Sequence, residues 1–313
     1  MQLLIAVLLF SLGLLLTVKG GDIFTVAASE ISEIFGIPKF IIGATIVSLA
    51  TTLPEFLVSV ISSVIGKNDM AVGNAIGSVS ANTGLILALC ALLIPCRFER
   101  KHYAFKTAIL ISCSAAIWIF SVGGSLRVWG AAVLLMLFLA FVFENVSAAK
   151  TPQKDSAQQT GPIFPSVLRF SFGALGIALG ARLLVDNASA IGLQLGISEA
   201  VISATVLAVG TSLPELATTL SAVKHRESAL SIGNILGANI IDLAIILPTC
   251  SVLSGGPLPV SRQAAAADMP FCFIIICVAL LPALVRGKFT RFHGAVTLFC
   301  YISYIIFTVY TAH

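Results

Sequence analysis

Three acidic residues, Glu55, Glu215 and Asp242, lie deep inside apolar stretches of the sequence. A carboxylate at the centre of a membrane span costs about 3 kcal/mol on insertion scales. The same stretches contain no Lys or Arg that could pair with the acids. We therefore expect the compensating charge to come from outside the chain, as bound cations or protons. The alternative is a set of protonated carboxyl groups that form hydrogen bonds between helices.

A proline directly precedes each glutamate, Pro54 before Glu55 and Pro214 before Glu215. Within a helix, proline removes one hydrogen bond and clashes with the carbonyl group four residues back. Carbonyl groups near each proline should therefore be free, and non-helical backbone is tolerated at membrane depth only where it lines a cavity. A simple kink is the less favoured explanation, because hydroxyl side chains accompany both breaks. These hydroxyl groups belong to Thr51, Thr52, Thr211 and Ser212.

An amide and further hydroxyl groups extend this set of oxygen donors. Ser78 and Asn82 are four residues apart and share one helical face, and Ala238 and Asp242 have the same spacing. Carboxylates, an amide, hydroxyl groups and backbone carbonyls would surround a bound ion with oxygen alone. Such a shell suits hard cations, and Ca²⁺ in particular takes about 6–8 oxygen ligands in flexible geometry. The set contains no His or Cys, which disfavours a soft transition metal.

The elements that position these residues must cross a membrane. Hydrophobic residues make up 58% of the 313-residue chain and charged residues 10%, with a mean hydropathy of +1.04. A soluble domain carries about 25% charged residues, so this chain could not cover a water-exposed surface. The net charge of +4, without a dense basic block, excludes nucleic acid as a partner. Seven cysteines without CxxC spacing indicate neither a disulfide framework nor a zinc site.

Ten runs of the sequence can cross a bilayer, which requires about 20 mostly apolar residues. The first run is taken as a span, because it lacks the basic segment that begins a signal peptide. The predicted fold is an all-α integral membrane protein with ten transmembrane helices, broken at Pro54 and Pro214. The predicted spans are 1–18, 40–65, 70–95, 104–122, 128–146, 164–185, 198–222, 229–253, 269–286 and 293–312.

The distribution of basic residues predicts the orientation of these spans. With the N-terminus outside, the inner loops hold 14 Lys and Arg residues and the outer loops hold 4. The positive-inside rule therefore places both termini outside. The polar stretch from Ser147 to Gly161 becomes a flexible cytoplasmic tether. We expect the chain to lie in the plasma (inner) membrane.

The sequence repeats itself at an offset of 160 residues, with 16 identities among the 65 positions of 20–84 and 180–244. Polar and helix-breaking residues dominate the matches, so shared apolar composition does not explain them. Two Gly-xxx-Gly patterns within the matches allow helices to approach closely. The matched segments are TTLPE (51–55) with TSLPE (211–215) and GNAIG (73–77) with GNILG (233–237), and Asn82 faces Asp242.

Each half of the chain holds five predicted spans, and an odd number turns the second half upside down relative to the first. We assign residues 1–146 to the first five-helix repeat, 147–163 to a cytoplasmic linker and 164–313 to the second repeat. Inverted repeats are typical of secondary transporters, whose binding site lies near mid-membrane where the repeats meet. A transporter is therefore the predicted class, not an enzyme.

At these motifs the sequence resembles the sodium/calcium exchanger family, prokaryotic type, of the cation/calcium antiporter superfamily. The family's G-T-S-L-P-E and G-N-x-x-G-S-N motifs read here as ATTLPE with GNAIGSV, and GTSLPE with GNILGAN. The resemblance implies that Glu55 and Glu215 are shared by Ca²⁺ and Na⁺, and that Asn82 and Asp242 complete the centre of the site. It also implies help from Thr51, Thr52, Thr211 and Ser212, with the Ser48 and Ala208 carbonyls and the Ser78 hydroxyl at flanking sodium positions.

Several residues depart from the family pattern. Thr52 replaces a serine and Ala50 a glycine, Val79 replaces an asparagine, and Ala238 replaces a serine. The loss of a hydroxyl at Ala238 weakens the expectation of several Na⁺ per Ca²⁺ more than it weakens Ca²⁺ binding. The proton-coupled branch, which carries a glutamate soon after the Gly-Asn pair, is the poorer match.

The leading hypothesis is antiport of Ca²⁺ against Na⁺ by alternating access, without a cofactor. Three carboxylates supply a charge of up to −3, so one proton in addition to the +2 of Ca²⁺ would balance the site. We expect sliding of spans 1 and 6, and a monomer whose partners are the transported ions and the lipid bilayer. The alternatives are H⁺-coupled cation exchange, a passive channel, and an intramembrane aspartyl protease that uses Asp186 and Asp242.

Overall fold

The computed structural model describes residues 2–95, 98, 100–150, 162–195, 210 and 212–311. Within these residues the chain is almost entirely helical, and its one sheet has two strands of two residues each. Seven helical segments are long and apolar enough to cross a membrane, and a bent pair, Lys39–Thr51 with Leu53–Val64, makes up to eight. The chain is therefore a multi-pass membrane protein. The seven segments are Leu3–Phe35, Asn68–Leu93, His102–Ser121, Val128–Ala149, Ile163–Gln194, Ser228–Leu253 and Ala264–Arg286.

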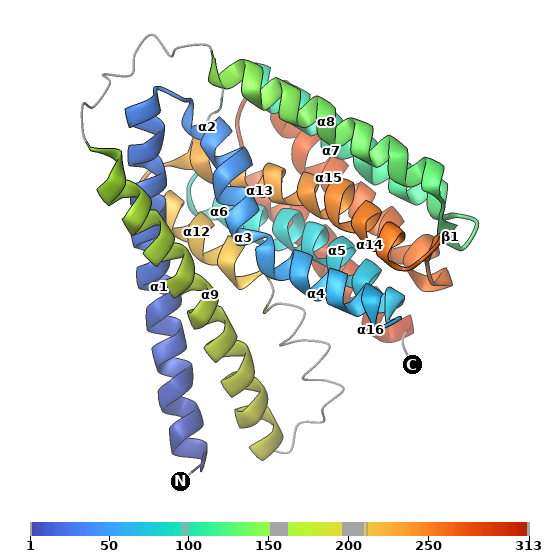
Figure 1. Cartoon of the computed structure of the whole chain (residues 1–313), viewed down its shortest axis with the longest axis horizontal. Helices are drawn as coiled ribbons and strands as arrows, with labels where there is room; N and C mark the ends of the chain where they lie inside the picture. Colours follow the sequence, from blue (N-terminus) through green and yellow to red (C-terminus); the bar gives the residue numbers. More distant parts are fainter. Residues whose placement is uncertain are drawn as a thin grey trace.

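The helices follow the order of the predicted spans (Figure 1). Predicted span 198–222 falls partly outside the described residues, which include only its second part, and the linker falls outside them from 151 to 161. In the first half the elements are α1 (Gln2–Phe35), α2 (Lys39–Ile42), η1 (Gly43–Val47), α3 (Ser48–Thr51), α4 (Leu53–Val64), α5 (Asn68–Ala81), η2 (Asn82–Leu87), α6 (Ala88–Leu93), α7 (Arg100–Ser121), β1 (Ser125–Leu126) and α8 (Val128–Ala149). In the second half they are α9 (Ile163–Gln194), α12 (Leu213–Lys224), α13 (Ser228–Ile241), η4 (Asp242–Ile246), α14 (Leu247–Leu253), β2 (Leu258–Pro259), η5 (Ala264–Asp268), α15 (Met269–Arg286) and α16 (Arg291–Thr311). The η elements are π-helical turns.

The first and sixth helices, α1 and α9, are longer than the predicted spans 1–18 and 164–185, with 34 and 32 residues. Beyond the predicted span, α1 continues over residues 19–35. The polar residues of this stretch suggest a loop in the sequence, yet the stretch forms an amphipathic helix. Its apolar side, with Phe24, Ala27 and Ala28, is fully buried. Its polar side is also engaged, since Asp22 pairs with Lys224. Tertiary contacts therefore keep this stretch helical.

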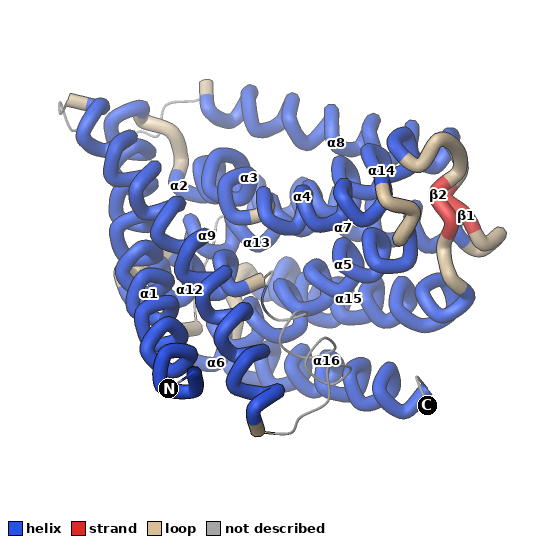
Figure 2. The backbone as a smooth tube through the Cα atoms, turned by 60° about the horizontal axis from the view of Figure 1, so that its bottom comes forward, coloured by secondary structure: helices blue, strands red, loops and turns tan. Residues whose placement is uncertain are grey.

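Helices α1 and α9 lie side by side along much of their length (Figures 1 and 2). Glycines bring their backbones together, because a Cβ atom at Gly20 would come within 2.9 Å of the Gly173 carbonyl oxygen. A Cβ at Gly180 would lie 2.7 Å from the Gly13 carbonyl oxygen. Side chains larger than hydrogen would push the two helices apart at these points. The pair therefore forms one closely packed unit.

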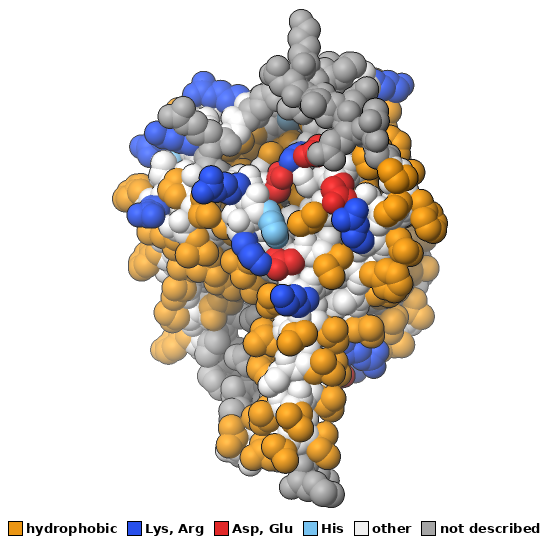
Figure 3. Space-filling view, turned by 90° about the vertical axis from the view of Figure 1, so that its left-hand side faces the viewer, with side chains coloured by type: hydrophobic (Ala, Val, Ile, Leu, Met, Phe, Trp, Pro, Cys, Tyr) orange, Lys and Arg blue, Asp and Glu red, His pale blue; other side chains and the backbone are white. Residues whose placement is uncertain are grey.

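Charged side chains gather in the upper part of the face shown in Figure 3, and hydrophobic ones dominate its lower part. Charged side chains also connect α1 to the rest of the chain. Asp22 pairs with Lys224 at the end of α12, and Glu227 accepts hydrogen bonds from Ser29 and Lys39. Lys224 ends α12 and Glu227 directly precedes α13, so these contacts lie where two spans meet and side chains can reach the membrane–water boundary.

Helix α13 forms the core of the bundle, and nearly all of its span is buried. It crosses α2 and η1 closely, because a Cβ at Gly233 would overlap the Phe40 carbonyl oxygen. A Cβ at Gly237 would meet the Ala44 carbonyl and the Ser48 hydroxyl. The predicted packing role of the second Gly-xxx-Gly pattern is confirmed. At Gly73 and Gly77 nothing in the described part of the chain lies within 4 Å of such a Cβ.

Element boundaries recur at the same offset of 160 residues that relates the two halves of the sequence. Helices α4 and α12 have 12 residues each, and α5 and α13 have 14 each. Both α5 and α13 pass into π-helical turns, which begin at Asn82 and Asp242. π-Helical turns often mark functional sites. The short strands β1 and β2 pair antiparallel and join the two halves.

Candidate functional site

The two glutamates occupy matching places, in the first turns of α4 and α12. Helix α4 meets the α2–α3 segment at a bend of 46°, with Thr52 at the break. Proline is favoured in the first turn of a helix because its missing N–H would have no intrahelical partner there. Pro54 and Pro214 stand at such positions, so each starts a new helix that presents a glutamate one residue later. The break predicted at Pro54 is confirmed.

Backbone bonds bridge the break at Thr52. The Thr52 amide donates to the Ser48 carbonyl at 2.9 Å, and the Phe56 amide donates to the Thr52 carbonyl at 3.0 Å. The Ser48 carbonyl therefore already accepts a hydrogen bond. Because proline has no N–H group, the Ala50 carbonyl, four residues before Pro54, receives no hydrogen bond from it.

The carboxyl groups at the site are fully buried and largely without hydrogen bonds. Glu55 is 1% exposed, and Glu215 and Asp242 are 0% exposed. A buried polar group without a partner costs about 1–3 kcal/mol, and more when it is charged. The protonated alternative requires hydrogen bonds from these carboxyl groups to other helices, and Glu55 and Asp242 make none among the described residues. Buried oxygen atoms that lack a partner among the described residues include both of Glu55, both of Asp242, and Glu215 Oε2, Asn82 Oδ1 and Ser212 Oγ.

The three acids are near enough to interact electrostatically with one another. Even so, no three Asp, Glu, His or Cys side chains in the described part of the chain converge tightly enough to hold a metal ion. Amide, hydroxyl and carbonyl oxygens would therefore have to supply part of any coordination shell. Because like charges repel, a cation placed among the acids would favour their closer approach.

Polar contacts join the broken segment of the first half to that of the second. The Thr52 hydroxyl donates to Glu215 Oε1 at 3.4 Å. Thr51 Oγ1 donates to Asn234 Oδ1 at 3.2 Å. Residues far apart in the sequence thus meet at one place, as the repeat predicts.

The structure buries most of the predicted site residues. Ser48, Ser78 and Asn82 are buried on α3, α5 and η2, and Ser212 is buried directly before α12, without a capping hydrogen bond from its side chain. The described hydrogen bonds directly connect Thr52 with Glu215, and Thr51 with Asn234. Two predicted residues, Ala208 and Thr211, lie outside the described residues.

Two asparagines that hold the glutamate-bearing helices were not predicted as site residues. Asn74 Nδ2 donates to the Glu55 carbonyl at 3.2 Å and to Ser59 at 2.9 Å. Asn234 Nδ2 donates to Thr218 Oγ1 at 3.1 Å. Their signal in the sequence is the Gly-Asn pair that recurs in both repeats, which can equally be explained by helix packing.

The two aspartates proposed for a protease occupy different environments. Asp186 is 64% exposed and pairs with Arg182 on the same helix, whereas Asp242 is fully buried in η4. An aspartyl protease needs two carboxyl groups that share one proton. This arrangement does not provide such a pair.

Comparison with known proteins agrees with a membrane ion-exchange protein. The family model for sodium/calcium exchanger proteins matches residues 5–146 and 165–310. Inner membrane protein YrbG of Escherichia coli is 34% identical over 299 residues, covering 91% of this chain and 92% of that protein. Sodium/calcium exchanger MaX1 of Methanosarcina acetivorans is 25% identical over 345 residues, covering 97% and 98%.

A solved structure of the sodium-calcium exchanger NCX_Mj, soaked with 10 mM Na⁺ and zero Ca²⁺, has a TM-score of 0.85 to this chain. The two sequences are 30% identical, and the match covers 97% of this chain and 99% of the other. The family match and the structural similarity thus identify a multi-pass cation/Ca²⁺ antiporter, not an enzyme. The chain belongs to the sodium/calcium exchanger protein family.

Proposed function

We propose that this protein exchanges Ca²⁺ for Na⁺ across the membrane by alternating access. The observation that carries the proposal is the group of buried carboxyl oxygens without hydrogen bonds on Glu55, Glu215 and Asp242. Such groups are stable only when a counter-charge or hydrogen-bond donors reach them. A cation that occupies the site supplies that charge, and its exchange for another cation is the transport reaction.

The proposed site uses oxygen ligands from both repeats. Glu55 and Glu215 bind Ca²⁺ and Na⁺ in turn, and Asn82 and Asp242 complete the centre. Flanking Na⁺ positions use the Ser78 hydroxyl and the carbonyl groups of Ser48 and Ala208. The Ser48 carbonyl accepts a hydrogen bond from the Thr52 amide in this structure, and because a carbonyl oxygen has two lone pairs it can also bind a cation. Hydroxyl or carbonyl groups of Thr51, Thr52, Thr211 and Ser212 supply the remaining oxygens.

The proposed architecture has ten spans in two inverted repeats, residues 1–146 and 164–313, with a cytoplasmic linker at 147–163. The equal lengths of α4 and α12, and of α5 and α13, support the repeat. Both termini lie outside, the chain resides in the plasma (inner) membrane, and it acts as a monomer. Movement of the α1–α9 pair against the bundle changes the side from which the ions enter.

Sodium is the proposed coupling ion. Two of the similar proteins are named sodium/calcium exchangers, which supports this choice. Three carboxylates and one Ca²⁺ leave a net charge of −1, so one proton can remain at the site during Ca²⁺ binding. Coupling to H⁺ instead of Na⁺ is the second candidate, because the same acids would carry the protons.

The test is uptake of radiolabelled Ca²⁺ into proteoliposomes loaded with Na⁺, compared with choline, at fixed pH. We expect uptake only with the outward Na⁺ gradient, and none in Glu55→Gln. Uptake driven by a proton gradient alone would replace Na⁺ by H⁺ as the coupling ion. Downhill flux without any counter-ion would indicate a channel, and absence of Ca²⁺ transport under both gradients would overturn the calcium assignment.

A further inference from the structure

We infer that Asn234 is a positioning residue: it accepts the Thr51 hydroxyl proton, so that the Thr51 oxygen faces the cation, and it ties Thr51 to the helix that carries Glu215. This inference depends on the proposed function, because it assigns a role in cation binding at the same site. Asn234 is buried on α13, between the broken segment of the first repeat and α12 of the second. It belongs to the Gly-Asn pair that recurs in the two halves.

The contacts of Asn234 form a directed chain of hydrogen bonds. Thr218 Oγ1 donates within its own helix, to the Pro214 carbonyl at 2.9 Å and the Glu215 carbonyl at 3.1 Å. A hydroxyl group has one proton, so Thr218 can only accept from Asn234. The Asn234 amide must therefore turn its nitrogen toward Thr218, at 3.1 Å, and its oxygen toward Thr51, at 3.2 Å.

This arrangement determines which way the Thr51 hydroxyl points. A hydroxyl oxygen can bind a cation through its lone pairs only when its proton is directed elsewhere. Thr51 can donate to Asn234 Oδ1 or to the Ser48 carbonyl, at 3.3 Å. When a cation occupies the carboxylate, Asn234 offers the proton an acceptor from the second repeat and leaves the Thr51 oxygen available as a ligand.

The equivalent residue of the first repeat makes a different set of contacts. Asn74 Nδ2 donates to the Glu55 carbonyl and to Ser59, both within the first repeat. Asn234 instead joins Thr51 of one half to α12 of the other. In the part of the chain that the structure describes, it is thus the amide that links the two glutamate-bearing segments. Loss of this link should weaken cation binding without removing any carboxylate.

The experiment measures equilibrium binding of radiolabelled Ca²⁺ to the purified full-length protein, with Na⁺ as competitor. Asn234→Leu removes both hydrogen bonds at similar volume, and one neutral hydrogen bond is worth about 0.5–1.5 kcal/mol, so we expect the Ca²⁺ Kd to rise roughly 2- to 10-fold. Asn145→Leu is the matched control, because Asn145 is also buried but its amide donates only to the Phe141 carbonyl of its own helix. The control should keep the wild-type Kd.

A double-mutant cycle distinguishes positioning from general loss of structure. If Asn234 acts through Thr51, Asn234→Leu should have little further effect on the Kd in a Thr51→Val background. Equal effects in both backgrounds, or a Kd that matches the Asn145→Leu control, would overturn the inference. Should Asn234→Leu fail to fold, Thr218→Val tests the same chain of bonds and should also raise the Kd. Absence of Ca²⁺ binding by the wild type would instead contradict the proposed function.

Discussion

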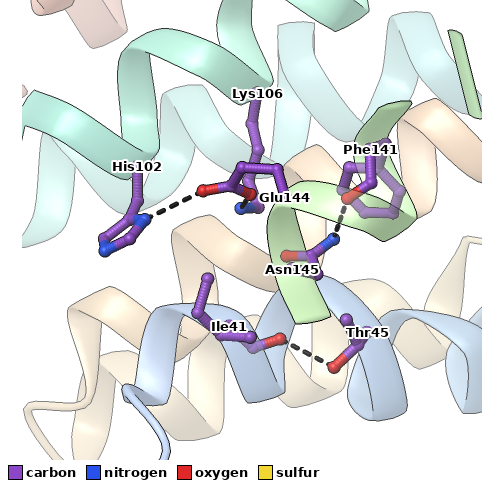
Figure 4. A network of polar contacts seen from close by, with 7 residues as sticks. All are labelled: Ile41, Thr45, His102, Lys106, Phe141, Glu144 and Asn145. Carbon is purple, nitrogen blue, oxygen red and sulfur yellow. Dashed lines mark hydrogen bonds and ion pairs between the residues drawn. The ribbon is translucent and has the colours of Figure 1, made fainter. Parts of the chain in front are cut away.

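Two regions of the molecule bury charged side chains in opposite ways. Between α7 and α8, the fully buried ammonium group of Lys106 pairs with Glu144, which also contacts His102 Nδ1 at 2.9 Å (Figure 4). The Phe40 ring centroid lies 5.1 Å from the same ammonium nitrogen. In the candidate ion site, by contrast, both oxygens of Glu55 and of Asp242 have no hydrogen-bond partner among the described residues.

The contrast separates a structural use of buried charge from a functional one. Lys106 and Glu144 neutralise each other, so this region requires nothing from outside the protein. At the candidate ion site, the charged groups that face Glu55 and Asp242 among the described residues are other carboxyl groups, and burial of such acids is costly until a cation arrives. A site that transports ions must be left incomplete by its own chain, because an internal Lys or Arg would compete with the cargo. The predictions below test this distinction.

The largest effect is expected at the ion site itself. Glu215→Gln removes a charge that no internal group replaces, so Na⁺-driven Ca²⁺ uptake should fall by roughly 100-fold or more, equivalent to about 3 kcal/mol of lost cation binding. The measurement is the initial uptake rate in proteoliposomes, corrected for reconstituted protein. The corresponding change in the other region, Glu144→Gln, should leave the Ca²⁺ concentration for half-maximal uptake close to that of the wild type. An equal loss of apparent Ca²⁺ affinity in both variants would show that the two regions do not differ in their role in ion binding.

The second prediction concerns stability in the Lys106 region. Lys106→Met leaves Glu144 without its ammonium partner, and breaking a buried ion pair from one side costs about 3–5 kcal/mol. We expect a marked fall in the Tm of the detergent-solubilised protein, measured by tryptophan fluorescence. The double variant with Glu144→Gln removes both charges and should recover much of the lost Tm. Failure to recover would show that Lys106 stabilises the fold through packing on Phe40, not through the ion pair.

The two regions also differ in how readily the sequence predicts them. The buried acids of the candidate ion site were predictable because they interrupt long apolar runs and because Pro54 and Pro214 mark where new helices start. The ion pair was not, since Lys106 and Glu144 are 38 residues apart and each lies close to the end of a predicted span. The length of α1 was missed for a related reason, because Asp22 resembles a loop residue until the position of Lys224 is known. Both features depend on contacts between residues far apart in the sequence, and local composition does not predict such contacts.

A third, smaller effect should accompany cation binding. A ligand that binds only the folded protein stabilises it by about 2.7 kcal/mol at 100 times its Kd. Ca²⁺ at that concentration should therefore raise the Tm of the wild type by several degrees, and Mg²⁺, which prefers a smaller, rigid octahedral shell, should raise it less. Lys106→Met should retain the Ca²⁺-dependent increase despite its lower starting Tm. Glu55→Gln should lose it. A Ca²⁺ response that persists in Glu55→Gln would place the stabilising ion elsewhere.

The smallest effect is expected where a charge pair is exposed. Lys224 pairs with Asp22 across α12 and α1, but its side chain is 62% exposed, and water and salt weaken such pairs to about 0–1 kcal/mol. Lys224→Met should change the Tm only slightly, and the difference from the wild type should shrink further at high salt. Asp22 would keep its hydrogen bond from Ser221, which limits the loss. A fall in Tm as large as that of Lys106→Met would show that this contact between the α1–α9 pair and the bundle behaves like a buried ion pair, so exposure alone would not predict how much a charge pair stabilises this fold.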